Sequence, residues 1–340
     1  FSQRQGVDYF QTFPPTLNMT TLQVLLHVAA QRDYELHSLD LSTAFLQGSL
    51  HEEIWLRRPP GFAGTKLAAL GFAPSTADPS LFLCTDTSLP PFYVLVYIDD
   101  LVFPTADTEA LTLVKSELQK RHTCTDLGEP RSYLGLQIIR DRAGRTITQT
   151  QLHMLHQSVE PSGPYPELVG CLMYLMMCTR PDLPYPLSLL ARYVAPVRRA
   201  WGSCLEDRVQ LSSLVTQSLL GSSCEAEIYA GAMAAQEPRW LTYVLTDLGE
   251  QPRSPPVLYV DNKAMIALCQ EHRLEHRTKH IALRYFLARE LQQRGQLCLA
   301  YVATRANTAD IFTKALPPSD HQRFSTVLGL VPTLPHLLIA

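Results

Sequence analysis

Residues 91–105, "PFYVLVYIDDLVFPT", carry two adjacent aspartates inside an otherwise apolar run. The flanking residues are β-branched or aromatic, which is typical of a buried strand. Burying an ionised carboxylate is costly unless it is paired or binds a cation. The run therefore predicts either a β-hairpin whose turn is Asp99-Asp100, or two carboxylates that stay ionised because they bind divalent cations.

Another aspartate lies in a short apolar stretch upstream. Leu36, Leu39 and Leu41 surround Asp40 and predict a strand, and "HEEIWLRRP" alternates like a further strand. If the strand with Asp40 joins the sheet of the hairpin, three carboxylates come together. Three carboxylates around two divalent metals suit phosphoryl transfer, because one ion activates the attacking 3′-hydroxyl and both stabilise charge on the phosphate.

Periodicity predicts further elements on both sides of this region. A helical stripe in "MTTLQVLLHVAAQRDY" follows Thr20 and Thr21, which could cap the helix. "SSCEAEIYAGAMAAQEPRWLTYVLTDLG" reads as a helix with small residues for close packing, and "PPVLYVDNKAMIAL" reads as a strand that ends at Asp261 and leads into a helix. A carboxylate at the carboxyl end of a strand is a usual place for a site.

The composition fits a globular protein of two ordinary domains. The chain has 340 residues, 46% hydrophobic and 18% charged. Its formal net charge of -3 gives no overall attraction to nucleic acid, although charge can gather locally. Eight cysteines without a C-x-x-C pair favour neither a zinc ribbon nor a disulfide framework and fit a reducing compartment. No apolar run is long enough to cross a bilayer, and "FSQRQGVDYF" indicates a fragment that begins within a domain.

Several stretches resemble, in the same order, the polyproteins of copia-type LTR retrotransposons. Their reverse transcriptase is similar to "LDLSTAFLQGSLHEEIWLRRPPGF", "YVLVYIDDLVF", "YLGLQI" and "VGCLMYLMMCTRPDL". The ribonuclease H that follows it is similar to "SSCEAEIYAGAMAAQEPRWL", "LYVDNKAMIAL", "EHRTKHIALRYFLARE" and "ANTADIFTKAL". The resemblance covers nearly the whole chain, and the order of the motifs makes it specific.

The resemblance implies a polymerase site in the first half. Asp40, Asp99 and Asp100 would bind two Mg²⁺ ions, or Mn²⁺, in a palm subdomain. Tyr97 would begin the Y-x-D-D motif at the nucleotide. Phe45, five residues after Asp40, would clash with a ribose 2′-hydroxyl and so favour deoxynucleotides, whereas the plain alternative for Phe45 is a core phenylalanine.

The resemblance also implies metal ligands in the second half. They would be an acid of the "CEAE" helix, Asp261, and Asp310 in "ANTADIFTK". Glu227 fits the helix position better than Glu225, because "EIYAGAMA" places small residues at the family's packing spacing. From the residues alone, both acids suit a solvated helix N-terminus equally well.

Basic residues prevail between Glu271 and Lys314. They are Arg273, Arg277, Lys279, Arg284, Arg289, Arg294, Arg305 and Lys314. A solvated basic face is the default interpretation, and contact with the backbone of an RNA–DNA hybrid is compatible with it. His272, His276 and His280 share one helix face, but no Cys or acid is spaced to complete a metal site with them.

Parts of the family pattern have no counterpart here. The finger strands would precede residue 1, and "AGTKLAAL" replaces a longer segment that lines the nucleotide pocket. "LEDRVQLSSLVTQSLLGSSCEAE" stands where the first ribonuclease H strand and its aspartate belong, and Asp207 is not in that context, so it is not assigned. Loss of one of four carboxylates should remove most hydrolytic activity, because both metals must be held at a fixed separation.

We therefore expect an α+β fold with a palm/fingers-like reverse transcriptase domain at 1–150, a helical connection at 151–205, and a truncated ribonuclease H-like α/β domain at 206–335. The predicted function is an RNA-directed DNA polymerase with ribonuclease H, impaired by deletions to the point of inactivity. The alternative is a catalytically dead remnant that binds nucleic acid. By family, the partners are an RNA template, a DNA primer, the RNA–DNA hybrid, dNTPs and other polyprotein products, without a membrane, in a cytoplasmic particle or the nucleus.

Overall fold

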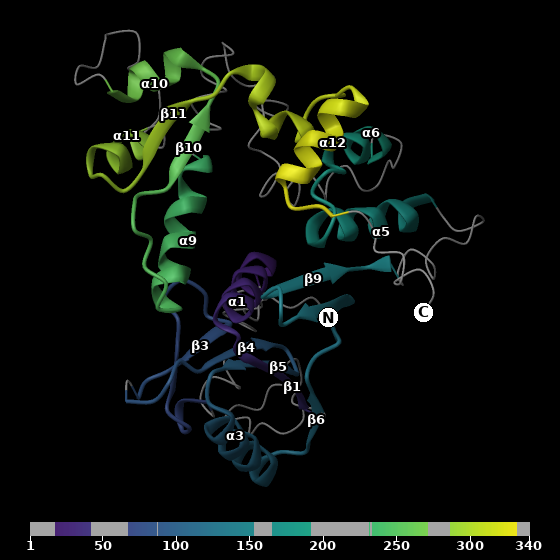
Figure 1. Ribbon diagram of the computed structural model, residues 1–340, viewed down its shortest axis with the longest axis vertical. Helices are drawn as coiled ribbons and strands as arrows, with labels where there is room; N and C mark the ends of the chain where they lie inside the picture. Colours follow the sequence, from purple (N-terminus) through teal and green to yellow (C-terminus); the bar gives the residue numbers. More distant parts are fainter. Residues whose placement is uncertain are drawn as a thin grey trace, which may run out of the picture. The chain divides into compact units, whose positions relative to one another are not determined.

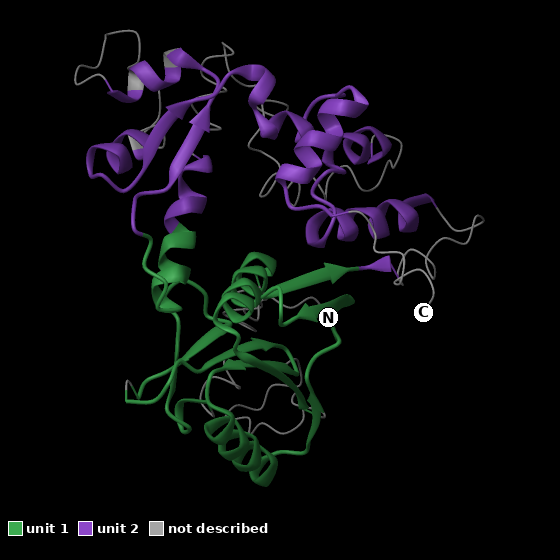
Figure 2. Cartoon of the chain, viewed as in Figure 1, with its two compact units in different colours: residues 1–150, 240–252 green, residues 151–239, 253–340 purple. Residues whose placement is uncertain are grey.

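The computed structural model describes residues 18–41, 67–86, 88–152, 165–191, 231, 233–270 and 286–331. The chain divides into two compact units, shown in Figure 2. Unit 1 comprises Phe1–Thr150 and Trp240–Pro252, and unit 2 comprises Gln151–Arg239 and Arg253–Ala340. Within the described ranges, no helix has the length and apolar character that a bilayer crossing requires.

Unit 1 is built on a six-stranded sheet with the strand order β2-β3-β4-β5-β1-β6 (Figure 1). Every neighbouring pair in this sheet is antiparallel. The strands are β1 (Glu35–Leu41), β2 (Phe72–Pro74), β3 (Leu81–Cys84), β4 (Tyr93–Tyr97), β5 (Asp100–Thr105) and β6 (Cys124–Gly128). The apolar stretch with Asp40 thus forms a strand beside the hairpin, as predicted from the sequence.

Two helices pack on this sheet. In α3 (Thr108–Arg121), Leu111 and Leu118 join the same buried cluster as Leu39, Leu101 and Phe103 of the sheet. The side chain of Asp107 begins α3 by accepting hydrogen bonds from two backbone N–H groups of the first turn. The face of the sheet that α3 covers is therefore buried.

The other helix, α1 (Met19–Arg32), presents a stripe of buried side chains at helical spacing. The stripe includes Leu22, Leu25, Leu26 and Ala29. Asn18 caps the helix by accepting from the backbone N–H of Thr20 at 3.0 Å, so the predicted cap at the threonines is wrong by two residues. Figure 1 shows α1 and α3 on opposite sides of the sheet.

A separate three-stranded antiparallel sheet, β7-β8-β9, follows the six-stranded sheet along the chain. Its strands are β7 (Ser132–Tyr133), β8 (Leu136–Asp141) and β9 (Thr146–Thr150). Leu134 and Gly135 connect β7 to β8 with φ values of 51° and 70°. Positive φ at both central residues is the geometry that matches the twist of a tight hairpin.

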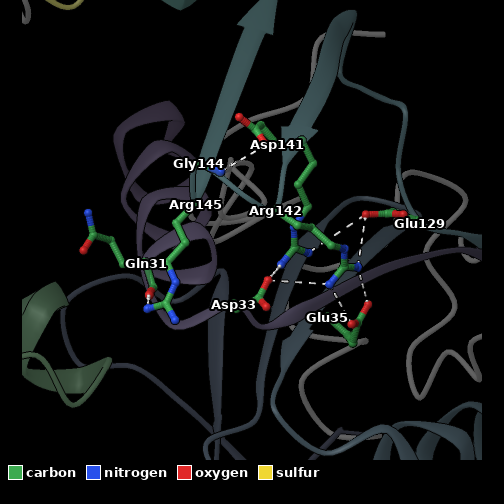
Figure 3. Close-up of polar contacts among 9 residues, drawn as sticks. Gln31, Asp33, Glu35, Glu129, Asp141, Arg142, Gly144 and Arg145 are labelled. Carbon is green, nitrogen blue, oxygen red and sulfur yellow. Dashed lines mark hydrogen bonds and ion pairs between the residues drawn. The ribbon is translucent and has the colours of Figure 1, made fainter.

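Arginines of this small sheet attach it to the strand that carries Asp40 (Figure 3). Arg142 donates two hydrogen bonds to the carboxylate of Glu35, at 2.8 and 2.7 Å. Arg140, whose side chain is 7% exposed, donates to Asp33 at 2.8 Å, and Arg142 also lies 3.6 Å from Glu129. Because Glu35 begins β1, these ion pairs hold the β8-β9 hairpin beside the six-stranded sheet.

Unit 2 contains helices and a two-stranded parallel sheet in its described residues. The elements are α5 (Tyr165–Cys178), α6 (Pro184–Ala191), β10 (Val257–Val260), α10 (Lys263–Gln270), α11 (Phe286–Gln293), β11 (Cys298–Tyr301), η5 (Thr304–Ala306), η6 (Thr308–Phe312) and α12 (Pro318–Val327). The helix α9 (Gln236–Asp247) begins in unit 2 and ends in unit 1. The mixture of helices and sheets agrees with the predicted α+β class, while the ribonuclease H-like architecture stays a prediction.

Candidate active site

Asp40 of β1 and Asp100 of β5 lie directly opposite each other on neighbouring antiparallel strands. Residues that are directly opposite point to the same face, with their Cβ atoms about 5 Å apart. The next residues in register, Leu39 and Leu101, point to the other face, where they belong to the core under α3. The alternation of two short strands therefore brings both carboxylates to the face away from α3.

Asp99 lies in the turn beside this pair. Tyr97 pairs with Asp100, so the two-residue turn between β4 and β5 consists of Ile98 and Asp99 rather than the predicted Asp99-Asp100. The backbone N–H of Leu41 donates to the carbonyl of Asp99 at 2.8 Å, which ties the turn to the end of β1. The predicted hairpin is thus confirmed, with its turn shifted by one residue.

The backbone of the turn is strained. Ile98 has a φ of 54°, in the left-handed region that β-branched residues rarely enter. Such a conformation costs on the order of 1–3 kcal/mol. Its side chain is exposed, so burial of apolar surface does not offset the cost.

The carboxylate of Asp100 lies in an unfavourable electrostatic environment. Burial raises its pKa, and the neighbouring charges of Asp40 and Asp99 raise it further. Within the described residues, no hydrogen-bond donor pairs with this carboxylate. A cation bound between the carboxylates would relieve this repulsion, because it inverts the local charge balance.

Tyr133 carries a buried hydroxyl close to the same carboxylate. The residue is 5% exposed, and its hydroxyl has no hydrogen-bond partner among the described residues. Burial, the charge of Asp100 and the phenol of Tyr97 raise the pKa of Tyr133, which indicates that its ring lies near the turn. Tyr133 begins the motif "YLGLQI", which by itself predicted no role for the tyrosine. The burial of its hydroxyl depends on the folded structure and cannot be predicted from the motif.

The donor set suits a hard divalent cation in part. Mg²⁺ prefers oxygen ligands and is often bound through one or two carboxylates together with substrate phosphates, which Asp40 and Asp100 can supply. In the described part of the chain, however, no three or more His, Cys, Asp or Glu side chains are gathered so that they could hold a metal ion. The three predicted ligands share one edge of the sheet without converging, and their role as metal ligands stays a prediction.

The acids predicted for the second half are placed less completely. Asp261 directly follows β10, as expected. Asp310 lies in η6, and its Oδ1 forms an ion pair with Nζ of Lys314 at 2.7 Å. Glu227, Glu225 and Phe45 lie outside the described residues. The predicted trio of Glu227, Asp261 and Asp310 therefore stays a prediction.

The basic stretch is described only in its last part. The residues 271–285, which include its three histidines, lie outside the described residues. Arg294 pairs with Glu290 at 2.6 Å, and Lys314 pairs with Asp310. These two cations are thus already neutralised locally, whereas Arg305 is exposed.

Comparison with known families shows what the region around these residues is similar to. Residues 1–66 and 64–160 match the family of reverse transcriptases (RNA-dependent DNA polymerases). The matched residues include the opposed pair Asp40 and Asp100, the turn with Asp99, and the hairpin with Tyr133. The first 160 residues therefore match a reverse transcriptase domain.

The chain as a whole is homologous over most of its length to Pol polyproteins of copia-type transposons. It is 27% identical to the retrovirus-related Pol polyprotein from transposon RE2 of Arabidopsis thaliana, over 98% of this chain and 30% of the relative. The polyprotein from transposon RE1 of the same plant is 27% identical over 97% and 30%, and that from transposon TNT 1-94 of Nicotiana tabacum is 25% identical over 97% and 33%. The chain thus spans about a third of the length of these curated relatives. No solved structure matches it significantly.

The alignments also bear on the missing segments. The comparison with the RE2 polyprotein extends over 443 residues, although this chain has only 340. The relative therefore has internal residues for which this chain has no counterpart. This agrees with the shortened junctions that the sequence predicts.

Proposed function

We propose that this chain is a reverse transcriptase and ribonuclease H region in which Asp40, Asp99 and Asp100 are the residues for two-metal nucleotidyl transfer. The observation that carries the proposal is the register of β1 and β5, which sets Asp40 opposite Asp100 beside the turn with Asp99. The raised pKa of Asp100 supports it, because burial and two neighbouring carboxylates leave a charge that a divalent cation would balance. The substrates would be an RNA template, a DNA primer and dNTPs.

Each residue has a separate role in this proposal. Asp40 and Asp100 offer carboxylate oxygens from adjacent strands, and Asp99 offers a third from the turn. Bound Mg²⁺ would supply activation of the attacking hydroxyl and stabilisation of phosphate charge. Tyr97 is in register with Asp100, so its side chain is on the carboxylate face, where the nucleotide would bind. Phe45 would select deoxynucleotides.

The ribonuclease H part of the proposal rests on Glu227, Asp261 and Asp310. Asp261 at the end of β10 is where the strand pattern predicted a site residue. Because the family's first strand and its aspartate have no counterpart, we expect no hydrolysis of the RNA strand of a hybrid.

A second candidate function follows from the length of the alignment. Since the RE2 polyprotein has internal residues that this chain lacks, the chain would be a remnant that binds nucleic acid without polymerising. Binding through exposed cations such as Arg305 would weaken steeply with salt and would not depend on Mg²⁺. Salt-insensitive binding would exclude this function.

The decisive experiment is calorimetric titration of the purified chain with Mn²⁺ and Mg²⁺. The proposal expects binding that is lost when both Asp99→Asn and Asp100→Asn are introduced. Asp86→Asn is the matched control, because Asp86 is an exposed loop aspartate of the same unit. Equal binding by all three proteins would contradict the proposal. If the chain binds cations, template-dependent dNTP incorporation that disappears in Asp99→Asn tests the polymerase itself.

A further inference from the structure

A segment far downstream of the reverse transcriptase match belongs to unit 1. The match to the reverse transcriptase family ends at residue 160. The compact unit that contains the carboxylates nevertheless includes Trp240–Pro252, the C-terminal half of α9 and the turn that follows it (Figure 2). The sequence predicts that these residues belong to a ribonuclease H-like domain at 206–335.

Hydrogen bonds hold the segment along its whole length. The indole Nε1 of Trp240 donates to the carbonyl of Ala77 at 2.9 Å. The hydroxyl of Tyr93 in β4 donates to the carbonyl of Leu248 at 2.7 Å, and this bond is buried. At the far end, Arg32 of α1 donates to Glu250 at 2.6 Å. The contacts thus involve a loop, a central strand and a helix of unit 1.

The loop that receives the segment is fixed by its own hydrogen bonds. The hydroxyl oxygen of Ser75 accepts from the backbone N–H groups of Ala77 at 3.0 Å and Asp78 at 3.2 Å. Its hydrogen remains available and is donated to Asp247 of the segment. A surface that is already ordered loses little conformational entropy when a partner docks, which favours binding.

The end of α9 is shaped to fit this surface. Val244 and Leu248 are four residues apart, so they share one helix face, and they are 0% and 2% exposed. Gly249, with a φ of 74°, ends the helix, and the N–H of Glu250 returns to the carbonyl of Leu245 at 2.8 Å. This cap leaves the carbonyl of Leu248 for Tyr93. Burial raises the pKa of Tyr93, so its hydroxyl stays protonated and remains a donor.

We propose that the loop 75–80 and strand β4 form a docking surface whose occupant is the segment 240–252 of the same chain. The reverse transcriptase unit of this protein is completed by this segment and does not end at the family boundary. The segment is an amphipathic helix end that offers an apolar face, an indole donor and a carboxylate. The indole donor of Trp240 matches the carbonyl of Ala77, and the carboxylate of Asp247 matches the hydroxyl of Ser75.

Hydrogen exchange of the full chain, followed by mass spectrometry, tests the docking. In Leu248→Ala, the amides of β3 and β4 should exchange at least about tenfold faster than in the wild type, because the buried anchor is truncated. In Tyr93→Phe, which removes one hydroxyl, the amides of 240–252 should exchange about fivefold faster, as loss of one buried hydrogen bond implies. Thr246→Ala is the control, since that hydroxyl bonds within its own helix to Thr242 and should leave β3 and β4 unchanged.

Three results would overturn the proposal. The first is unchanged exchange in β3 and β4 of Leu248→Ala. The second is faster exchange confined to β10 and β11 in either variant, which would assign the segment to unit 2. The third is a wild-type mass of two chains in light scattering that falls to one chain in Leu248→Ala, which would assign the docked segment to a second copy. None of these measurements depends on cation binding, so their failure is distinct from failure of the polymerase proposal.

Discussion

The loop 75–80 and the turn 97–100 of unit 1 each remove a carboxylate from water, but they treat it in opposite ways. Asp78 is 4% exposed and accepts hydrogen bonds from the N–H of Ser80 at 2.9 Å, from the hydroxyl of Ser80 at 2.6 Å and from the hydroxyl of Thr21. Asp100 is partly buried beside two further carboxylates, and no described residue donates to it. The carboxylate of Asp78 has hydrogen-bond donors within the fold, whereas that of Asp100 has none among the described residues.

This difference separates a structural carboxylate from a candidate functional one. A buried charge with a full set of donors holds its surroundings in place, and its removal leaves those donors without a partner. A charge that the fold has placed among like charges costs stability, and its removal relieves the fold. Mutations at the two positions should therefore change the free energy of unfolding in opposite directions.

The largest effect is expected for Asp78→Ala. Removal of the carboxylate leaves the donors of Thr21 and Ser80 unsatisfied in a buried loop, which should lower the free energy of unfolding by about 3 kcal/mol. Urea denaturation followed by circular dichroism measures it. Asp86→Ala is a close control, because Asp86 accepts the same two bonds from Ser88, at 3.0 and 2.6 Å, in an exposed loop. A loss of equal size in both variants would contradict the structural role of Asp78.

A gain of about 1 kcal/mol is expected for Ile98→Asn, measured in the same way. Asparagine tolerates the left-handed conformation that Ile98 adopts, so the substitution should relieve strain in the turn. Ile98→Val keeps the β-branched side chain and should give no gain. If the two variants have the same stability, the turn is not strained.

Asp100→Asn should stabilise the fold slightly, by less than about 1 kcal/mol after solvent screening. Because the pKa of Asp100 is raised in the fold, protonation of this group stabilises the folded state below the unfolded pKa, and that stabilisation is lost as the pH rises through the folded pKa. The advantage of the variant should therefore be larger at pH 7 than at pH 4. An advantage that is the same at both values would show that Asp100 is not perturbed.

The smallest effect is expected on the opposite face of β1, at His37. The ammonium of Lys115 lies 2.9 Å from Nδ1 of His37 and 2.6 Å from Asp126, and burial followed by the charge of Lys115 lowers the pKa of His37. Asp126 and the more distant Glu35 and Glu129 oppose this shift. Because the pKa of His37 is lower in the folded state than in the unfolded state, the folded state is stabilised by neutral His37 above the unfolded-state pKa. This stabilisation is lost as the pH falls through the folded-state pKa. His37→Asn keeps an acceptor without titrating, so its denaturation midpoint should depend less on acidic pH than that of the wild type.

Much of unit 1 could be predicted from the sequence, because its sheet depends on local patterns. The alternating stretch around Asp40 and the apolar run before Ile98 formed the expected strands in one sheet, and the family was identified correctly. The exact turn was missed, since both aspartates are turn formers and only the pairing of Tyr97 with Asp100 decides between them.

Contacts between distant segments could not be predicted. The donors that satisfy Asp78 come partly from α1, and the partner of Tyr93 is a backbone carbonyl, which has no signature in the sequence. The bonds of Arg140 to Asp33 and of Arg142 to Glu35 likewise join residues that are 107 positions apart. Side-chain identity predicts which bonds can form, and only the fold determines which of them do.

The bond between Tyr93 and Leu248 spans 155 positions of the chain. Contacts of such long sequence separation form slowly, because a large loop must close before they contribute. A chain emerging from the ribosome reaches β4 well before the helix end that docks there. Unit 1 must therefore wait, with its docking surface open, until residue 252 has been synthesised, and during that interval it is most exposed to aggregation.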